Sequence, residues 1–140
     1  MEYKSIAEKT IGHLYSAHRS VRISGIDTKI IAMVELYVSQ INGCAYCCSF
    51  HSNELREMGV AQSLIDKLPG FRHSKVFSEE QNIALEWAES LTLIDNKIDI
   101  DPIKSKLLKY FNERQFVELT ASISLMNALN RLRISLGDKD

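Results

Sequence analysis

The sequence predicts an all-α protein that folds as a compact multi-helix single domain. Apolar residues recur at steps of three and four along nearly the whole chain, which is the period of one helix face. We find no alternating apolar and polar segment long enough for a strand, no internal repeat and no low-complexity linker. Because 140 residues can bury a real core without disulfide bridges, we expect residues 1–140 to form one domain.

Four helices are expected in the first half of the chain. They cover residues 2–21, the segment from Asp27 to about Gln40, the segment from the first cysteine to Gly59, and residues 61–67. The carboxylate of Asp27 can cap the second of these helices, and Asn42-Gly43 interrupts it. Gly59 is placed to end the third helix as its C′ residue, where a left-handed conformation is common.

Three more helices are expected in the second half. Ser78 and Gln81 have the spacing of a capping box, in which each side chain bonds the backbone N–H of the other residue. The helix that they open is expected to bury one apolar face: Ile83, Ala84, Trp87, Ala88, Leu91 and Ile94. Asp101-Pro102 offers another cap, with proline at the first helical position. A long helix from Asn112 to Gly137 closes the chain.

The composition is that of an ordinary globular protein in water. Hydrophobic residues make up 45% of the chain and charged residues 25%, and the formal net charge is −1. This balance gives no basic field for nucleic acid or an anionic membrane, and no apolar run approaches the ~20 residues of a membrane-spanning helix. Since the first residues also lack the pattern of a signal peptide, we expect a cytoplasmic protein with neither of these partners.

The clearest chemical signal is the segment from Cys44 to His51, with the sequence Cys-Ala-Tyr-Cys-Cys-Ser-Phe-His. Cys44, Cys47 and His51 would share one face of a helix, because residues three and four apart are neighbours on a helix surface. A thiolate at a helix N-terminus is stabilised by unpaired backbone N–H groups, by the helix dipole and by a nearby imidazolium. Clustered cysteines in a reducing compartment are more often catalytic or metal-binding than structural. The spacing therefore predicts a reactive dithiol.

Around this motif the sequence resembles the alkylhydroperoxidase D-like branch of the carboxymuconolactone decarboxylase family. The stretch from Val38 to Cys47, followed by His51 and by Glu54 to Gly59, is similar to the redox signature of that family, and the likeness covers roughly residues 20–136. It implies an all-helical fold and assembly into a homo-trimer or hexamer. It also implies thiol-dependent reduction of peroxides through a transient disulfide.

One position departs from the family pattern. Family members usually carry a glutamate twelve positions before the first motif cysteine, as part of a proton relay through the motif histidine, and here that position is Ala32. Glu35 lies one turn later on the same expected helix and on a similar face. Either Glu35 replaces the missing carboxylate, or the relay is absent and any peroxidase activity is weak.

The residues of the motif can be given roles in such a reaction. Cys47 is assigned as the peroxide-reactive thiol, because His51 lies one turn away and can take its proton. Cys44, at the exposed helix start, is then the resolving thiol and the contact for an external dithiol reductant. The helix dipole favours Cys44 as the thiolate, so the reverse order stays open. Cys48 is expected to be inert packing, and three histidines on other elements are expected to be surface or packing residues: His13, His18 and His73.

The leading hypothesis is therefore a thiol peroxidase that acts on a hydroperoxide and needs neither a metal nor an organic cofactor. A metal-binding helical module is an alternative, but structural zinc sites usually gather four ligands from two separated pairs, and no second Cys/His pair is visible. The decarboxylase reaction of the wider family is a further alternative, although that branch typically lacks the dithiol. A redox sensor that keeps the dithiol without turnover also stays open.

Overall fold

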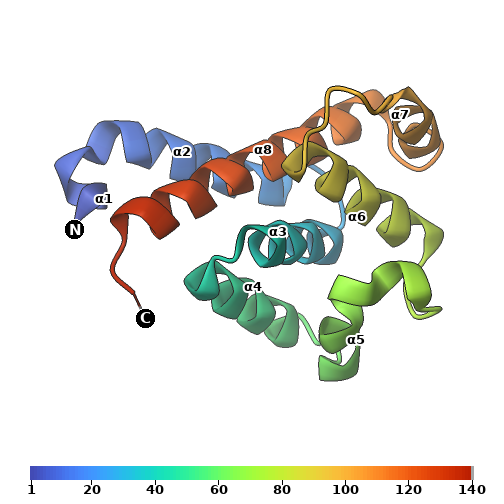
Figure 1. The fold of residues 1–140 in the computed structure, drawn as a ribbon, viewed down its shortest axis with the longest axis horizontal. Coiled ribbons are helices and arrows are strands. Elements are labelled where there is room, and N and C mark those ends of the chain that lie inside the picture. Colours follow the sequence, from blue (N-terminus) through green and yellow to red (C-terminus); the bar gives the residue numbers. More distant parts are fainter. Residues whose placement is uncertain (140) are drawn as a thin grey trace.

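The computed structural model describes residues 1–139, and within them the chain forms eight α-helices and two 3-10 helices without a strand (Figure 1). The bounds are α1 Tyr3–Ile6, α2 Glu8–Ser20, η1 Val21–Ile23, α3 Thr28–Asn42, α4 Ala45–Glu57, α5 Gln62–Lys67, η2 Leu68–His73, α6 Glu79–Thr92, α7 Asp101–Leu107 and α8 Glu113–Leu136. The all-helical class expected from the sequence is confirmed. None of the helices in this part of the chain has the length and apolar character needed to span a bilayer.

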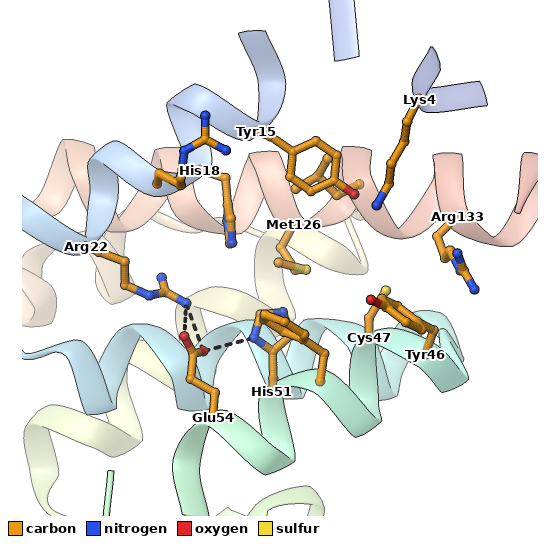
Figure 2. Close-up of a pocket in the computed structure, with 13 residues that line it drawn as sticks. Lys4, Tyr15, His18, Arg22, Tyr46, Cys47, His51, Glu54, Met126 and Arg133 are labelled. Atoms are coloured by element: carbon orange, nitrogen blue, oxygen red, sulfur yellow. Dashed lines mark hydrogen bonds and ion pairs between the residues drawn. The ribbon is translucent and has the colours of Figure 1, made fainter. Parts of the chain in front are cut away.

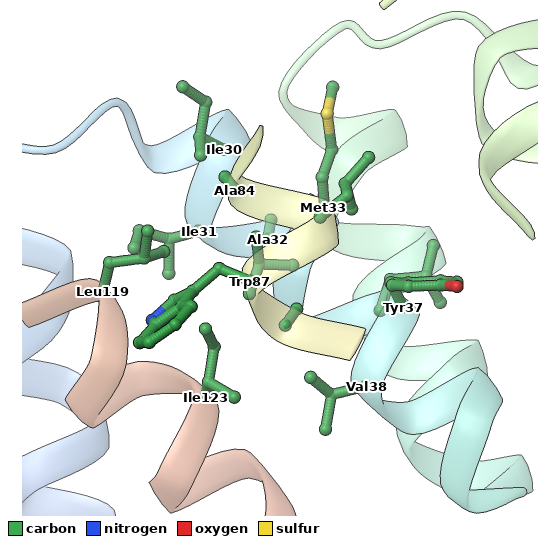
Figure 3. Packing of buried hydrophobic residues seen from close by; sticks show 14 of the residues in the cluster. Ile30, Ile31, Ala32, Met33, Tyr37, Val38, Ala84, Trp87, Leu119 and Ile123 are labelled. Atoms are coloured by element: carbon green, nitrogen blue, oxygen red, sulfur yellow. The ribbon is translucent and has the colours of Figure 1, made fainter. Parts of the chain in front are cut away.

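Helix α3 is the centre of the molecule, and every residue from Ile30 to Ser39 is buried. A helix that is apolar on all sides has to be covered on all sides, and α4, α6 and α8 pack around this one (Figure 1). Figure 3 shows Trp87 of α6 with Leu119 and Ile123 of α8 in this core. The indole N–H of Trp87 donates a hydrogen bond to Thr120 Oγ1 at 3.0 Å, so its polar atom is satisfied.

Side chains of helix α8 hold the C-terminal end of α3 by hydrogen bonds. Asn112 and Gln115 form a capping box at its start, with hydrogen bonds of 3.0 and 2.8 Å. Further along α8, Asn127 and Asn130 each accept a hydrogen bond of 3.0 Å from the side-chain amide of Asn42. The last turn of α3 is therefore held in place just before the cysteine motif.

Gly43 turns the chain from α3 into α4. It has φ 71° and ψ 30°, a left-handed conformation that glycine adopts without strain, and it ends α3 as the Asn42-Gly43 break predicts. The backbone N–H of Cys44 returns to the carbonyl of Ser39 at 3.0 Å. Cys44 thereby becomes the residue that caps α4, with Ala45 as the first helical residue.

Most of the expected helix ends are confirmed. The carboxylate of Asp27 accepts a hydrogen bond from the Lys29 N–H at 2.9 Å. Gly59 has φ 82° just after α4. Ser78 and Gln81 form the capping box that opens α6.

Three local expectations were wrong. The first helix is interrupted at Ala7, where φ is −122° and ψ is 49°, so that two helices replace the expected one. Ile94 lies beyond the end of α6 and is 77% exposed, because the backbone of Leu93 has already left the helical region. Asp101 is the first residue of α7 rather than its cap, and the carboxylate of Asp99 accepts its backbone N–H at 3.0 Å.

Candidate functional site

Cys44 and Cys47 are joined by a disulfide at the start of α4, with Cα atoms 5.3 Å apart. Cys44 is the N-cap, and its sulfur accepts the backbone N–H of Cys47 at 3.4 Å. The predicted placement at a helix N-terminus, within the ~4.4–6.8 Å that a disulfide needs between Cα atoms, is confirmed. The two sulfurs can therefore alternate between a dithiol and a disulfide without rearrangement of the helix.

The two cysteines are both buried, although to different degrees. Cys44 is 1% exposed and Cys47 is 8% exposed. The expectation that Cys44 is exposed at the helix start was wrong, because the end of α8 and the residues that follow it lie beside this turn. Ile134 and Gly137 line one hollow of about 380 Å³ together with Cys44. This hollow lies directly beside Cys44.

Cys48 is a free, half-buried thiol that packs against the hydrophobic core. Burial raises the pKa of this thiol above its ordinary value, which disfavours the reactive thiolate. The structure thus places Cys48 as the sequence led us to expect, as a packing residue beside the dithiol.

His51 lies in the interior of the site, one turn after Cys47 on α4. It is buried, and its Nδ1 atom lies 3.2 Å from Glu54 Oε1 and 3.4 Å from Glu35 Oε2. A carboxylate at Nδ1 holds an imidazole in one orientation and directs its other nitrogen, Nε2, toward the reaction partner. Figure 2 shows His51 and Cys47 along the same face of α4, with Glu54 on the far side of the ring from Cys47.

Glu35 is a fully buried carboxylate at the centre of a polar cluster. Its two oxygens accept hydrogen bonds from both terminal nitrogens of Arg22, at 2.9 and 2.6 Å. The hydroxyl of Ser122 on α8 donates a further bond at 3.0 Å, and Nδ1 of His18 on α2 lies 3.4 Å away. Such pairing and hydrogen bonding offset the cost of burying a carboxylate. The structure therefore brings Glu35 to His51, as the displaced-relay hypothesis requires.

Arg22 joins the two carboxylates that face His51. Besides Glu35, it donates a hydrogen bond to Glu54 at 3.0 Å. Burial alone would lower the pKa of the guanidinium, but the hydrogen bonds and Coulomb attraction of Glu35 and Glu54 outweigh it and hold the pKa above its ordinary value. Burial would in turn raise the pKa of Glu54, but the hydrogen bond from His51 and the charge of Arg22 lower it instead. Both carboxylates are thus anchored by one permanent cation.

Sequence analysis missed Arg22 and left His18 outside the site. Both precede the motif by more than twenty residues, and their arrival beside Glu35 depends on how α2 and η1 pack against α3 and α8. His18 is largely buried, its ring centroid lies 6.3 Å from that of His51, and its Nδ1 atom has no hydrogen-bond partner. Their spacing of four residues, which puts two polar side chains on one helix face, was the available signal.

Ala32 lies in the hydrophobic core. It is fully buried, and the same core contains Trp87 of α6 (Figure 3). The position at which the family resemblance implies a glutamate is therefore part of the apolar packing in this chain, and the carboxylates beside His51 come from Glu35 and Glu54.

A cavity of about 360 Å³ opens in front of the reactive groups (Figure 2). It lies between α1, α2, α4 and α8, and these residues line it: Lys4, Tyr15, His18, Arg19, Arg22, Tyr46, Cys47, Phe50, His51, Glu54, Met126, Leu129 and Arg133. Cys47 and His51 both reach this cavity, whereas Cys44 does not. A small molecule in the cavity would therefore meet Cys47 and His51 together.

Three groups in the site have the composition of a metal site. Ligand atoms of Glu35, His51 and Glu54 lie within 4.8 Å of one another. The guanidinium of Arg22 already donates hydrogen bonds to both carboxylates. A metal ion would have to displace this cation and leave it buried and unpaired, which is costly. The arrangement fits a proton-handling site better than a metal site.

The profile of the Carboxymuconolactone decarboxylase family matches residues 10–90, from α2 into α6. The chain belongs to this family. The chain is also similar to two uncharacterized proteins. YdfG of Bacillus subtilis is 29% identical over 139 residues, which make up 99% of this chain and 95% of the relative. YnjA of Escherichia coli is 26% identical over 113 residues, which make up 81% of this chain and 62% of the relative.

Solved structures agree with this carboxymuconolactone decarboxylase fold. A protein of unknown function from Agrobacterium tumefaciens, with a suggested role as the antioxidant defence protein AhpD, superposes with a TM-score of 0.92 at 25% identity. The superposition covers 99% of this chain and 95% of that protein. A peroxidase-related protein from Silicibacter sp. TM1040 shares the fold with a TM-score of 0.82 at 19% identity, over 94% of this chain and 70% of its own. The resemblance noted in the sequence is thereby confirmed.

Proposed function

We propose that this protein is a thiol-dependent peroxidase that reduces hydroperoxides with the Cys44–Cys47 dithiol. The observation that carries the proposal is the position of Cys47. Its sulfur belongs to a redox pair at a helix N-terminus, and it lines the same cavity as His51, whose Nδ1 atom is held by two carboxylates. The suggested antioxidant role of the Agrobacterium tumefaciens protein agrees with this activity.

In the first step, His51 takes the proton of the Cys47 thiol. The thiolate attacks the terminal oxygen of the hydroperoxide, the O–O bond breaks, and the departing alkoxide takes a proton from the His51 imidazolium to give an alcohol. Cys47 is then a sulfenic acid. Glu35 and Glu54 stabilise the imidazolium in this step and hold its ring, because both carboxylates lie at Nδ1.

In the second step, the Cys44 thiol attacks the sulfenic sulfur and water leaves, which forms the disulfide. An external dithiol then reduces the disulfide by thiol–disulfide exchange and is itself oxidised to a disulfide. The hollow beside Cys44, which shares Tyr46 and Arg133 with the cavity in front of Cys47, supports approach of this reductant to Cys44. No metal or organic cofactor takes part in these steps.

Peroxide consumption with a small dithiol as reductant tests the proposal in four proteins. The wild type is expected to turn over repeatedly, and Cys48→Ser is expected to do the same. Cys47→Ser is expected to consume no peroxide. Cys44→Ser, treated with peroxide in the absence of the dithiol, is expected to form at most one sulfenic acid per chain without a disulfide. If the wild type oxidises its dithiol once and then stops, the protein is a redox sensor. If peroxide leaves the thiols unchanged, the proposal is wrong.

We also propose that the protein assembles as a homo-trimer or as a hexamer. Several large apolar side chains of the described residues are exposed in the single chain: Ile6, Ile23, Ile94, Ile98 and Val117. Closed symmetric assemblies are the usual way in which soluble proteins bury such surface. Light scattering at micromolar concentration gives the mass directly, and a strict monomer would contradict this assembly.

A further inference from the structure

We infer that the cavity in front of Cys47 selects hydroperoxides that combine an apolar body with an anionic group, such as a carboxylate. This inference rests on the proposed peroxidase function and names its substrate class. Three features of the cavity carry it: its size, the apolar side chains of its walls, and the cations that converge on it from three helices.

The cavity suits a small organic molecule rather than hydrogen peroxide alone. Its volume of about 360 Å³ falls within the ~300–1,000 Å³ typical of small-molecule sites. Two aromatic walls face each other across it, Tyr15 on α2 and the pair Tyr46 and Phe50 on α4, and α8 closes it with Met126 and Leu129. Hydrogen peroxide would leave most of this apolar surface in contact with water, whereas an arene or alkyl chain would cover it.

Most of the charged side chains that line the cavity are cations. Glu54 is the one carboxylate among the lining residues, and Arg22 and His51 bind it. Arg22 in turn forms ion pairs with Glu35 and Glu54. Lys4 and Arg19 are further cations of the lining, so the cavity carries positive charge although the chain as a whole has a net charge of −1.

Two of the lining cations are held over the rings that form the walls. The Lys4 ammonium lies 4.9 Å from the centroid of the Tyr15 ring, and the Arg133 guanidinium lies 4.2 Å from that of Tyr46. Arg133 also donates a hydrogen bond to the backbone carbonyl of Asp138 at 3.4 Å. The cation–π contact of Lys4 keeps its charge at the edge of an apolar wall without neutralising it.

Two of the cations lie on other walls than the reactive sulfur. Lys4 reaches the cavity from α1, whereas Cys47 lies on α4 (Figure 2). Arg19 reaches it from α2. A ligand with an anion at one end and a hydroperoxide at the other can contact both walls at once, with its apolar body between them. Binding at the anionic end would then place the peroxide at Cys47, which raises the rate by orientation.

A matched pair of substrates tests this selection. Cumene hydroperoxide is neutral, and its derivative with a carboxylate para to the hydroperoxide-bearing carbon has the same body and the same reactive group. The wild type is expected to show a kcat/KM about five- to tenfold higher for the carboxylate, since each partly exposed ion pair contributes a few tenths to about 1 kcal/mol. In Lys4→Glu the ratio of the two kcat/KM values should fall to about one or below. Lys9→Glu makes the same charge change at an exposed residue of α2 outside the cavity, and it should keep the wild-type ratio.

Binding of the two product alcohols, measured by calorimetry or by NMR shifts, separates this inference from the proposed function. If neither hydroperoxide is turned over, the peroxidase proposal has failed. Tighter binding of the carboxylate alcohol, lost in Lys4→Glu, would still support anion selection by the cavity. Equal binding of both alcohols, or equal kcat/KM values for both hydroperoxides in the wild type, would overturn it.

Discussion

Arg22 holds Glu35 with both terminal nitrogens of its guanidinium, at 2.9 and 2.6 Å, and Glu35 is the fully buried partner of this pair. The same guanidinium reaches Glu54 at 3.0 Å, so one cation fixes both carboxylates that face His51. A buried carboxylate without such a partner would have to take up a proton or disrupt its surroundings. The arrangement of both carboxylates thus depends on Arg22, a residue outside the cysteine motif.

Arg22→Met is expected to lower the free energy of unfolding by roughly 3–5 kcal/mol, because it leaves Glu35 buried and unpaired. Urea unfolding measures the loss. Arg114→Gln removes an exposed arginine of α8 and is expected to change the stability by less than ~0.5 kcal/mol.

The double variant Arg22→Met/Glu35→Gln tests whether the contributions of Arg22 and Glu35 to stability depend on each other. With the charge of Glu35 removed, the loss should be clearly smaller than the sum of the two single losses, since contacting residues are not additive. Fully additive losses would show that Arg22 and Glu35 do not depend on each other.

Glu35→Gln is expected to slow peroxide turnover by about 10²-fold, the lower end of an acid–base contribution. The amide keeps the shape of the side chain but no longer stabilises a proton on His51. Steady-state kinetics measures the effect, with circular dichroism to show that the fold is intact. Glu57→Gln on the exposed face of α4 is the control. Unchanged turnover in Glu35→Gln would leave His51 as the base without help from this carboxylate.

Stability is expected to fall as the pH drops below neutrality, because of His18. Burial, with Arg22 and His51, lowers the pKa of His18 below the 6.5 of a free histidine, while Glu35 and Glu54 oppose the shift. Below pH 6.5, His18 binds a proton in the unfolded chain but stays neutral in the folded chain. The free energy of unfolding therefore decreases as the pH falls from this value toward the pKa of His18 in the folded state. The pKa of Glu54 is also lowered, from 4.5, and its contribution is lost at more acidic pH as the carboxylate becomes protonated.

Urea unfolding between about pH 7 and about pH 5 measures the His18 contribution, since this range spans an ordinary histidine pKa. His18→Gln should flatten the pH dependence in this range. His13→Gln removes an exposed histidine from the same helix and should leave the slope as it is in the wild type. Equal slopes in His18→Gln and the wild type would contradict the assignment.

The sequence predicted those parts of the molecule that depend on local rules. The caps at Asp27 and Ser78, the turn at Gly43 and the placement of Cys44 and Cys47 all follow from residue type and spacing over a few positions. Arg22 and His18 could not be placed in this way, because their approach to Glu35 is decided by packing between distant segments. The burial of Cys44 escaped prediction for the same reason, since residues almost a hundred positions later line the hollow beside it.

Ala32→Glu, which would restore the family carboxylate, is expected to harm this protein. The family pattern places a proton-relay glutamate at this position. The structure places Ala32 in the apolar core with Trp87, where a glutamate would bury its charge among apolar side chains and would overfill a packed region.

We therefore expect Ala32→Glu to lose several kcal/mol of stability, of the order of ~3 kcal/mol or more, without a gain in peroxide turnover. Ala32→Leu is the matched control: it overfills the same space without a charge and should cost about 1–3 kcal/mol. The difference between the two variants in urea unfolding measures the cost of the buried charge. A stable Ala32→Glu protein with faster turnover would show that position 32 can still reach His51, and that Glu35 is not the carboxylate on which this site depends.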